Sequence, residues 1–189
     1  MATSDAVVFF DFTNSQEWEL WLAEHSDRKD EAWIRVAKKG TGIQSITIEE
    51  ALDCALCYGW IDSHRRSFDE RYYLQRYSPR RSKSPWSKVN VKKAEQLIET
   101  GQMKEQGYAE IRLAQADGRW DIAYESQKTA EIPPDLAAAL ELHTQAKQAF
   151  HRLDKTAQYA LFLPILKAAT SSVRSTRLRK VIAKLEYVR

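Results

Sequence analysis

Apolar and polar positions follow two different periods along the first 57 residues. Apolar runs such as AVVFFDF and AWIRVAKK, rich in β-branched and aromatic residues, predict short strands, whereas apolar residues three and four apart predict helices. The elements expected in order are a strand over 6–12, a helix capped by Asn14 or Ser15, a strand over 32–39 and a short extended segment over 43–48. In the first helix Trp18, Trp21 and Leu22 share one face, which predicts that they lie in the core.

The start of a second helix is marked by its capping sequence. Thr47 is followed three residues later by Glu50, the spacing at which each side chain accepts a hydrogen bond from the other residue's backbone N–H. The apolar face that follows consists of Ala51, Leu52, Ala55 and Leu56. Gly59 is expected to end this helix because glycine adopts the backbone conformations that other residues avoid.

After Gly59 the pattern changes to period two. Residues 60–68 and 71–78, separated by Asp69 and Glu70, predict a β-hairpin. Regular alternation places its side chains in two sets, with Trp60, Asp62, His64 and Arg66 on one face and Ile61, Ser63 and Arg65 on the other. A basic loop containing two prolines follows over 78–85.

The remaining chain is predicted to be helical. The expected helices cover 91–101 with Asn90 as the N-cap, 104–118, 135–153, 155–169 with Asp154 as the N-cap, and 177–188 starting from Ser175 or Thr176. Pro133 and Pro134 close a linker before the last three of these helices. Pro164 is expected to kink or split its helix, because it lacks a backbone N–H.

This order of elements predicts an α+β fold: a small, mostly antiparallel sheet covered by helices, with a helical C-terminal module. The predicted domains are an α+β core over 1–130, which carries the basic hairpin and loop, and the helical module over 131–189. A chain of 189 residues with 43% hydrophobic residues is long enough for this core.

Charge is concentrated in one part of the chain. Residues 58–93 contain ten Lys and Arg against three Asp and Glu, interleaved with seven aromatic residues, whereas the whole chain has a net charge of only +3. The first 57 residues and residues 94–130 are net acidic, and residues 131–189 are net basic. Such segregation favours a polarised surface with a local site over a uniformly cationic protein.

Several classes of protein are disfavoured by the composition. Two cysteines cannot form a disulfide framework, and the N-terminal sequence has no basic residues before its apolar run, which is unlike a signal peptide. No apolar run approaches the roughly 18 residues of a membrane span. The sequence therefore predicts a cytoplasmic protein without membrane insertion, and it carries no signal for an oligomeric state.

Five blocks of sequence resemble a known family. They are EALDCALCYGWID, RYYLQRYSPRRSKSPWSKVN, LIETGQM, ADGRWDIAY and STRLRKVIAKL. Together they resemble the YdeI/OmpD-associated, or bacteriocin-protection, family from about Trp18 to Leu185. The resemblance implies a role in tolerance to antimicrobial peptides or to envelope stress, and it implies no reaction and no catalytic residues.

Cysteine and metal chemistry is disfavoured. Cys54 and Cys57 form a C-x-x-C pair inside a predicted helix, whereas reactive pairs lie exposed at a helix N-terminus. A zinc site needs four ligands, and only His64 lies near this pair in the sequence. The sequence predicts core packing for the cysteines, no metal and no cofactor, since it also lacks a glycine-rich phosphate loop.

Asp62 and His64 are the candidate acid–base pair. Alternate strand positions would place them on one face, where a carboxylate orients an imidazole and raises its basicity. Polar strand faces without catalytic function are common, and no serine or cysteine nucleophile accompanies the pair.

Basic side chains of the same stretch are the candidate anion-binding residues, because guanidinium groups pair bidentately with carboxylate and phosphate. They are Arg65, Arg66, Arg76, Arg80, Arg81, Lys83 and Lys88. Trp86 joins them as a stacking platform for a base or ring, or else fills the core where loop meets helix. The arginines could equally form internal salt bridges with Asp62, Asp69 and Glu70.

Three functions therefore remain open. The first is a non-catalytic protein that binds an anionic small molecule or an acidic partner and acts in stress or bacteriocin tolerance. The second is an enzyme acting on a small anionic substrate through Asp62 and His64. The third is a nucleic-acid-binding protein that adds Arg174, Arg177, Arg179 and Lys180 to the basic patch. A deep pocket would favour the enzyme, a continuous basic stripe would favour nucleic acid, and a shallow cleft would favour the first function.

Overall fold

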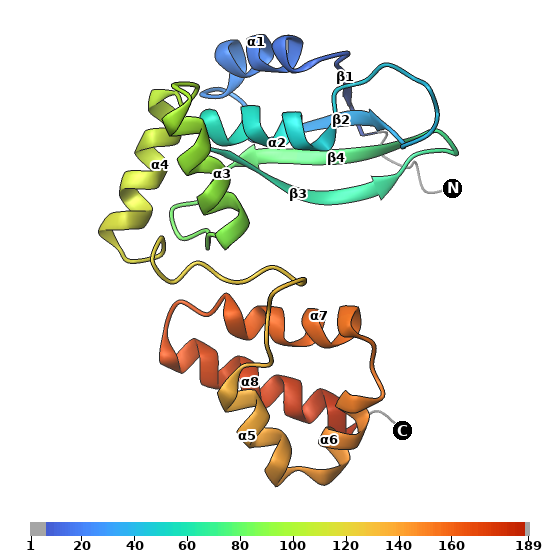
Figure 1. The fold of residues 1–189 in the computed structure, drawn as a ribbon, viewed down its shortest axis with the longest axis vertical. Helices are drawn as coiled ribbons and strands as arrows, with labels where there is room; N and C mark the ends of the chain where they lie inside the picture. The colour runs from blue at the N-terminus through green and yellow to red at the C-terminus, as the bar shows by residue number, and fades with distance from the viewer. Residues whose placement is uncertain (1–6, 188–189) are drawn as a thin grey trace. The chain divides into compact units, whose positions relative to one another are not determined.

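A computed structural model describes residues 7–187 of the chain. Within these residues the fold is α+β, as predicted, with eight helices and one four-stranded sheet (Figure 1). In chain order the elements are β1 (Phe10–Asp11), α1 (Ser15–His25), β2 (Ala32–Ala37), α2 (Ile48–Cys57), β3 (Trp60–Ser67), β4 (Tyr72–Pro79), α3 (Lys88–Glu99), α4 (Glu105–Ala116), α5 (Pro134–Leu142), α6 (Thr144–His151), α7 (Lys155–Leu166) and α8 (Ser171–Glu186).

The described residues group into two compact units. The first unit comprises residues 7–84 and 92–117, and the second comprises 85–91 and 118–187. The first unit contains the whole sheet with α1, α2 and α4, and the second contains α5 to α8. The predicted division into a core domain over 1–130 and a module over 131–189 stays a prediction.

The sheet of the first unit has the strand order β1-β2-β4-β3. β2 and β3 both pair antiparallel with β4, so the predicted hairpin and the mostly antiparallel sheet are confirmed. β1 runs parallel to β2, because helix α1 carries the chain back between the two strands.

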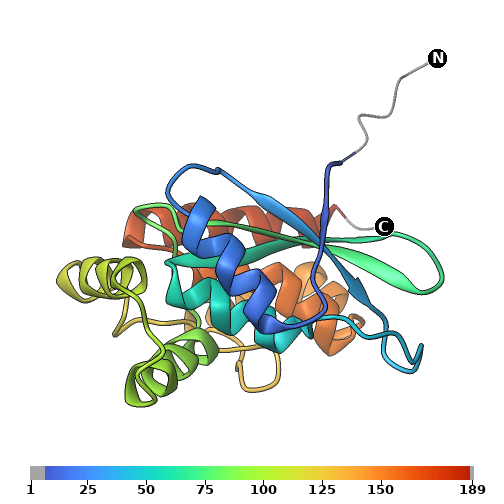
Figure 2. The same cartoon turned by 90° about the horizontal axis from the view of Figure 1, so that it is seen from above.

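Helices α1 and α2 lie on the same face of this sheet, as both views of the fold show (Figures 1 and 2). We call it the helix-covered face. Its core contains Trp18 and Leu22 from α1 and Ile34, Trp60 and Tyr77 from the strands, all of them almost inaccessible to solvent. Trp21, predicted to lie in the core, is only partly buried and packs against the ring of Phe10. These aromatic contacts fix the sheet against α1.

Local sequence explains where the first two helices begin. The Asn14 side chain accepts a hydrogen bond from the backbone N–H of Glu17, so Asn14 is the N-cap of α1. Thr47 and Glu50 form the predicted capping box at the start of α2, with each side chain bonded to the other's backbone. Both caps depend on residues three apart and are visible in the sequence.

A close approach between α2 and α4 depends on two glycines. Gly59 ends α2 with a φ of +71°, and a Cβ there would lie 2.9 Å from the Gln106 carbonyl oxygen. A Cβ on Gly107 would lie 2.5 Å from the Cys57 carbonyl oxygen. Only glycine permits this packing of α4 against the end of α2, and only the first of the two glycines was assigned a role from the sequence.

Two predicted strands near the N-terminus are shorter or absent. β1 contains two residues instead of the expected seven over 6–12, and Ala6 lies outside the described residues. The segment 43–47 forms no strand, because its backbone contact with the β1 region is a single hydrogen bond from Ile46 N–H to the Phe12 carbonyl.

Helices α5 to α8 of the second unit surround their own apolar core. Its buried residues are Leu136, Leu140, Ala146, Phe150, Phe162, Ile165, Val181, Ile182 and Leu185. The predicted single helix over 135–153 is interrupted at His143, which separates α5 from α6. The last helix begins earlier than predicted, at Ser171 with Thr170 as its N-cap, and Val188 lies outside the described residues.

Two arginines of α8 bind the ends of other helices in this unit. Arg174 forms a bidentate ion pair with Asp135 in the first turn of α5, with both N–O distances at 2.7 Å. Arg177 donates to the carbonyl oxygen of Pro164. Pro164 lies inside α7, which continues to Leu166, so the predicted split of this helix is wrong. Both arginines therefore act within the bundle.

We predict that Asp135→Asn destabilises the second unit in a pH-dependent way. The hydrogen bond from Arg174 lowers the pKa of Asp135 below its ordinary value of about 3.9, so the ion pair stabilises the fold at neutral pH and is lost as pH falls through the lowered pKa. Because the pair is about one-third exposed, its contribution should be at most about 1 kcal/mol.

Urea unfolding of the full chain between pH 7 and pH 2 measures this effect. Wild type and variant should differ at pH 7 and converge at the acidic end. A difference that stays constant over this range would contradict the ion-pair account.

Candidate functional site

A β-bulge in β3 determines how the basic side chains of the hairpin are arranged. Asp62 pairs with Tyr77 of β4, but the next paired residue, Arg65, lies opposite Gln75, so Ser63 and His64 together occupy the space opposite Arg76. An extra residue in one strand shifts every later side chain to the opposite face. The regular alternation expected from the sequence therefore ends after Asp62.

The side chain of Gln75 holds the bulge in place. Gln75 is 2% exposed, and its Nε2 donates to the carbonyl oxygens of His64 at 3.2 Å and Arg76 at 3.3 Å. Its Oε1 accepts from Nε of Arg65 at 2.9 Å. A buried amide that is satisfied on both sides fixes the geometry of the strand around it.

Because of the bulge, Arg65 and Arg66 lie on the opposite sheet faces from those predicted. Arg65, expected opposite Asp62, shares the helix-covered face with it, and its guanidinium lies 4.6 Å from the Tyr73 ring. Arg66, expected beside Asp62, points to the other face. His64 lines a cleft on that other side together with Arg66 and Arg76. The structure therefore does not bring Asp62 and His64 together as an acid–base pair.

The sheet face opposite α1 and α2 is rich in arginine, and we call it the arginine face. By strand register it carries Trp33, Arg35, Arg66, Leu74 and Arg76. A cleft of about 910 Å³ lies at this face and around the edge of β2. Its lining includes four cationic residues, Lys29, Arg65, Arg66 and Arg76, and one carboxylate, Glu31.

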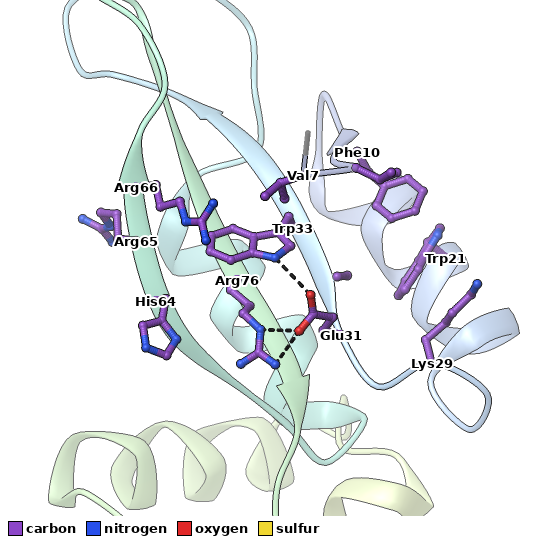
Figure 3. A pocket seen from close by; sticks show the side chains of 12 residues that line it. Val7, Phe10, Trp21, Lys29, Glu31, Trp33, His64, Arg65, Arg66 and Arg76 are labelled. Carbon is purple, nitrogen blue, oxygen red and sulfur yellow. Dashed lines mark hydrogen bonds and ion pairs between the residues drawn. The ribbon is translucent and has the colours of Figure 1, made fainter. Parts of the chain in front are cut away.

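Figure 3 shows how the cleft side chains are placed. Trp33, Glu31 and Arg76 lie in its middle, His64 and Arg66 extend from β3 on one side, and Phe10, Trp21 and Lys29 lie on the other. The side chain of Arg65 points away from Trp33. The cleft is thus cationic on the β3 side and mainly apolar on the α1 side.

Arg76 and Trp33 both donate to one carboxylate in the centre of the cleft. Nε of Arg76 lies 2.6 Å from Oε2 of Glu31, and Nε1 of Trp33 lies 3.2 Å from Oε1. The hydrogen bond from Arg76 is the main cause that lowers the pKa of Glu31. Arg76 also donates to the Ser63 hydroxyl in the bulge, which ties β4 to β3 at this point.

Arg66 is bound in a different way. Its guanidinium lies 4.8 Å from the Trp33 ring, so the side chain reaches from β3 across β4 to β2. Among the described residues no carboxylate forms a salt bridge with Arg66. A stacked guanidinium keeps its in-plane N–H groups available, because the ring contacts only its flat face.

Arg35, the remaining arginine of the arginine face, is bound to other residues of the first unit. Arg35 forms a bidentate ion pair with Asp11 at 2.7 and 2.8 Å. Its guanidinium also lies against the rings of Phe9, Phe68 and Tyr72. This arginine therefore stabilises the sheet and is not a candidate ligand-binding residue.

The other predicted anion-binding residues are dispersed. Arg80 is 6% exposed and lies inside the first unit. Arg81 and Lys83 are exposed in the loop before α3. Lys88 belongs to the second unit, where it forms an ion pair with Glu125 at 2.5 Å. Within the first unit, the predicted anion-binding residues are thus divided between the cleft, a buried position and an exposed loop.

Trp86 is buried in the second unit. It is 2% exposed and packs edge to face against Trp120 with 4.8 Å between ring centroids, both residues belonging to the second unit. Its burial agrees with the interpretation of Trp86 as a core residue. α3 begins at Lys88 instead of after Asn90, because the Ser87 hydroxyl accepts from the Asn90 N–H.

The two cysteines lie in unreactive surroundings. Cys57 is buried and Cys54 is partly buried, and both are free thiols on α2. Burial raises the pKa of Cys54 to about 12 and that of Cys57 to about 11. Both thiols are therefore protonated at neutral pH.

Residues 7–187 contain neither a metal-ligand cluster nor a helix that could span a membrane. No group of three or more His, Cys, Asp or Glu side chains there could hold a metal ion. No helix in the same residues is both long enough and apolar enough to cross a membrane.

The cleft residues outside the basic stretch were not predicted from the sequence as parts of a site, and Lys29, Glu31 and Trp33 are among them. Lys29 and Glu31 lie before β2 and outside the basic stretch, and Trp33 was assigned only to a strand. The alternation along β2 would place Trp33 and Arg35 on one face, but the sequence does not show which strand pairs with β2.

Two families match different parts of the chain. Residues 10–110 match the model of a domain of unknown function, DUF8412. Residues 129–187 match the model described as bacteriocin-protection, YdeI or OmpD-associated. The resemblance to the latter family is confirmed over a shorter range than the predicted Trp18 to Leu185. No curated protein and no solved structure matches the chain.

We predict that Gln75→Leu loosens the bulge. Leucine fits the buried position but leaves the His64 and Arg76 carbonyls without the amide donor and Arg65 without its acceptor. The loss should cost about 1–3 kcal/mol and speed amide hydrogen exchange in β3.

Urea unfolding and hydrogen exchange with mass spectrometry measure both effects. Gln115→Leu, at an exposed position of α4, is the matched control and should leave β3 unchanged. Unchanged stability and exchange in Gln75→Leu would refute the role of this amide.

Proposed function

The chain belongs to the family of the domain of unknown function DUF8412 and carries a C-terminal region of the bacteriocin-protection, YdeI or OmpD-associated family, and we propose that it binds an anionic ligand in the cleft of its first unit. Binding, without a chemical reaction, is the activity that the cleft supports best. We further propose that this binding acts in stress or bacteriocin tolerance, an inference supported by the description of the C-terminal family.

One observation carries the proposal, namely the stacking of Arg66 on Trp33. The ring contact holds the guanidinium 4.8 Å from the indole, in the lining of a cleft that Lys29 and Arg76 also line. A guanidinium held in this way can form two parallel hydrogen bonds to a carboxylate or phosphate. Because its conformation is already restricted, little further entropy is lost when a ligand binds.

Partial burial adds to the strength of this site. The side chain of Arg76 is 21% exposed, and Trp33 is 7% exposed. Hydrogen bonds between charged groups are stronger where water is partly excluded. Several cations around one partly enclosed volume therefore favour binding of a small anion inside the cleft over weak binding at the open surface.

The other two functions receive less support from the structure. The enzyme hypothesis depended on Asp62 and His64 sharing one face, and the bulge separates them. The nucleic-acid hypothesis added Arg174, Arg177, Arg179 and Lys180. The first two bind Asp135 and the Pro164 carbonyl inside the bundle, and only the last two are exposed. We therefore propose neither for this chain.

We predict that Arg66→Gln weakens anion binding at least tenfold. The probes are inorganic phosphate, ATP and an acidic peptide, each titrated by calorimetry at low salt. Loss of a charge-assisted hydrogen bond costs about 1.5–3 kcal/mol, which corresponds to a factor of about 10 to 150 in the dissociation constant.

Arg81→Gln is the matched control, because Arg81 is an exposed arginine of the same unit outside the cleft. It should bind like wild type. Arg80→Ala is not a suitable probe, since Arg80 is buried. Equal binding by wild type and Arg66→Gln, or no binding of any probe to wild type, would overturn the proposed function.

A further inference from the structure

Glu31 occupies a position in the cleft that is built for a carboxylate. Its Oε2 accepts from Nε of Arg76 at 2.6 Å, and its Oε1 accepts from the indole N–H of Trp33 at 3.2 Å. The two donors thus bind the two oxygens of one planar group separately. Such an arrangement matches the shape of a carboxylate.

The donors are fixed, whereas the acceptor lies at the surface. Arg76 and Trp33 are opposite each other in the paired strands β4 and β2, and Trp33 is almost buried. Glu31 precedes β2, outside any helix or strand, and its side chain is 47% exposed. A partly exposed ion pair contributes little net stability, so a competing carboxylate can replace Glu31 at small cost.

The walls of the cleft indicate what such a carboxylate would be attached to. Val7, Phe10 and Trp21 line the side next to α1 and supply an apolar surface beside the Glu31 position (Figure 3). Arg66 and Lys29 supply further positive charge in the same cavity. A ligand that satisfies both surfaces has an apolar body and at least one carboxylate.

We propose that the cleft binds amphipathic carboxylates and that the ligand's carboxylate displaces Glu31 from Arg76 and Trp33. This inference rests on the proposed function and adds the ligand class and the residue that competes with the ligand. Glu31 is then an internal competitor that lowers the apparent affinity of the cleft. Removing its charge strengthens binding, whereas removing a donor weakens it.

Calorimetric titration of the full chain with 2-naphthoate, acetate and inorganic phosphate tests this proposal. Naphthoate offers both a carboxylate and an apolar body, acetate lacks the body, and phosphate lacks the planar group. We expect naphthoate to bind wild type more tightly than the other two probes. Glu31→Gln should bind naphthoate at least tenfold more tightly than wild type.

Two further variants locate the effect. Glu70→Gln removes an exposed carboxylate of the same unit outside the cleft and should bind naphthoate like wild type. Trp33→Phe keeps an aromatic ring under Arg66 but removes the indole N–H, so it should weaken naphthoate binding in the Glu31→Gln background. In nitrogen-15 spectra, naphthoate should shift the indole N–H signal that Trp33→Phe abolishes.

The outcomes separate this inference from the proposed function. If naphthoate binds wild type and Glu31→Gln equally well and the Trp33 indole signal does not move, the displacement is refuted while anion binding stands. If phosphate binds more tightly than naphthoate, the ligand class is wrong. If neither protein binds any of the three anions, the inference fails, and if ATP and the acidic peptide do not bind either, the proposed function fails with it.

Discussion

The β-bulge between Asp62 and Arg65 is the feature on which the candidate site depends. Without it, Arg66 would share a face with Asp62 under the helices, and the ring of Trp33 would lack its cationic partner. With it, the faces of the two arginines are exchanged, so Arg65 reaches Tyr73 and Arg66 reaches Trp33. The buried Gln75 amide makes this arrangement stable, because it satisfies both the strand with the extra residue and its partner.

Much of the fold could be predicted because its signals are local. The capping box at Thr47 and the burial of Trp18 and Leu22 depend on residues three or four apart, so the sequence shows them directly. The bulge depends on Gln75, which lies ten residues after Arg65 and acts only once the strands are paired. The alternation of polar and apolar residues along β3 does not show that the strand contains an extra residue.

The sequence predicted that the candidate site is rich in arginine, but it did not predict which residues come together in it. The basic stretch contains Arg65, Arg66 and Arg76, which line the cleft. Arg80, however, is buried, Arg81 and Lys83 lie in an exposed loop, and Lys88 belongs to the second unit. Basic residues that are neighbours in the sequence lie apart in the first unit, because successive side chains of a strand point to opposite faces and the loop changes direction. The acidic residue at the centre, Glu31, comes from a region whose net charge is negative.

The central claim is that the bulge places Arg66 on Trp33, and proton NMR tests it most directly. Nuclear Overhauser contacts should join the Arg66 side chain to the Trp33 indole and the Arg65 side chain to the Tyr73 ring, with upfield ring-current shifts of both arginine δ-methylene groups. Contacts between Arg66 and Tyr73, the pattern of a hairpin without a bulge, would contradict the account.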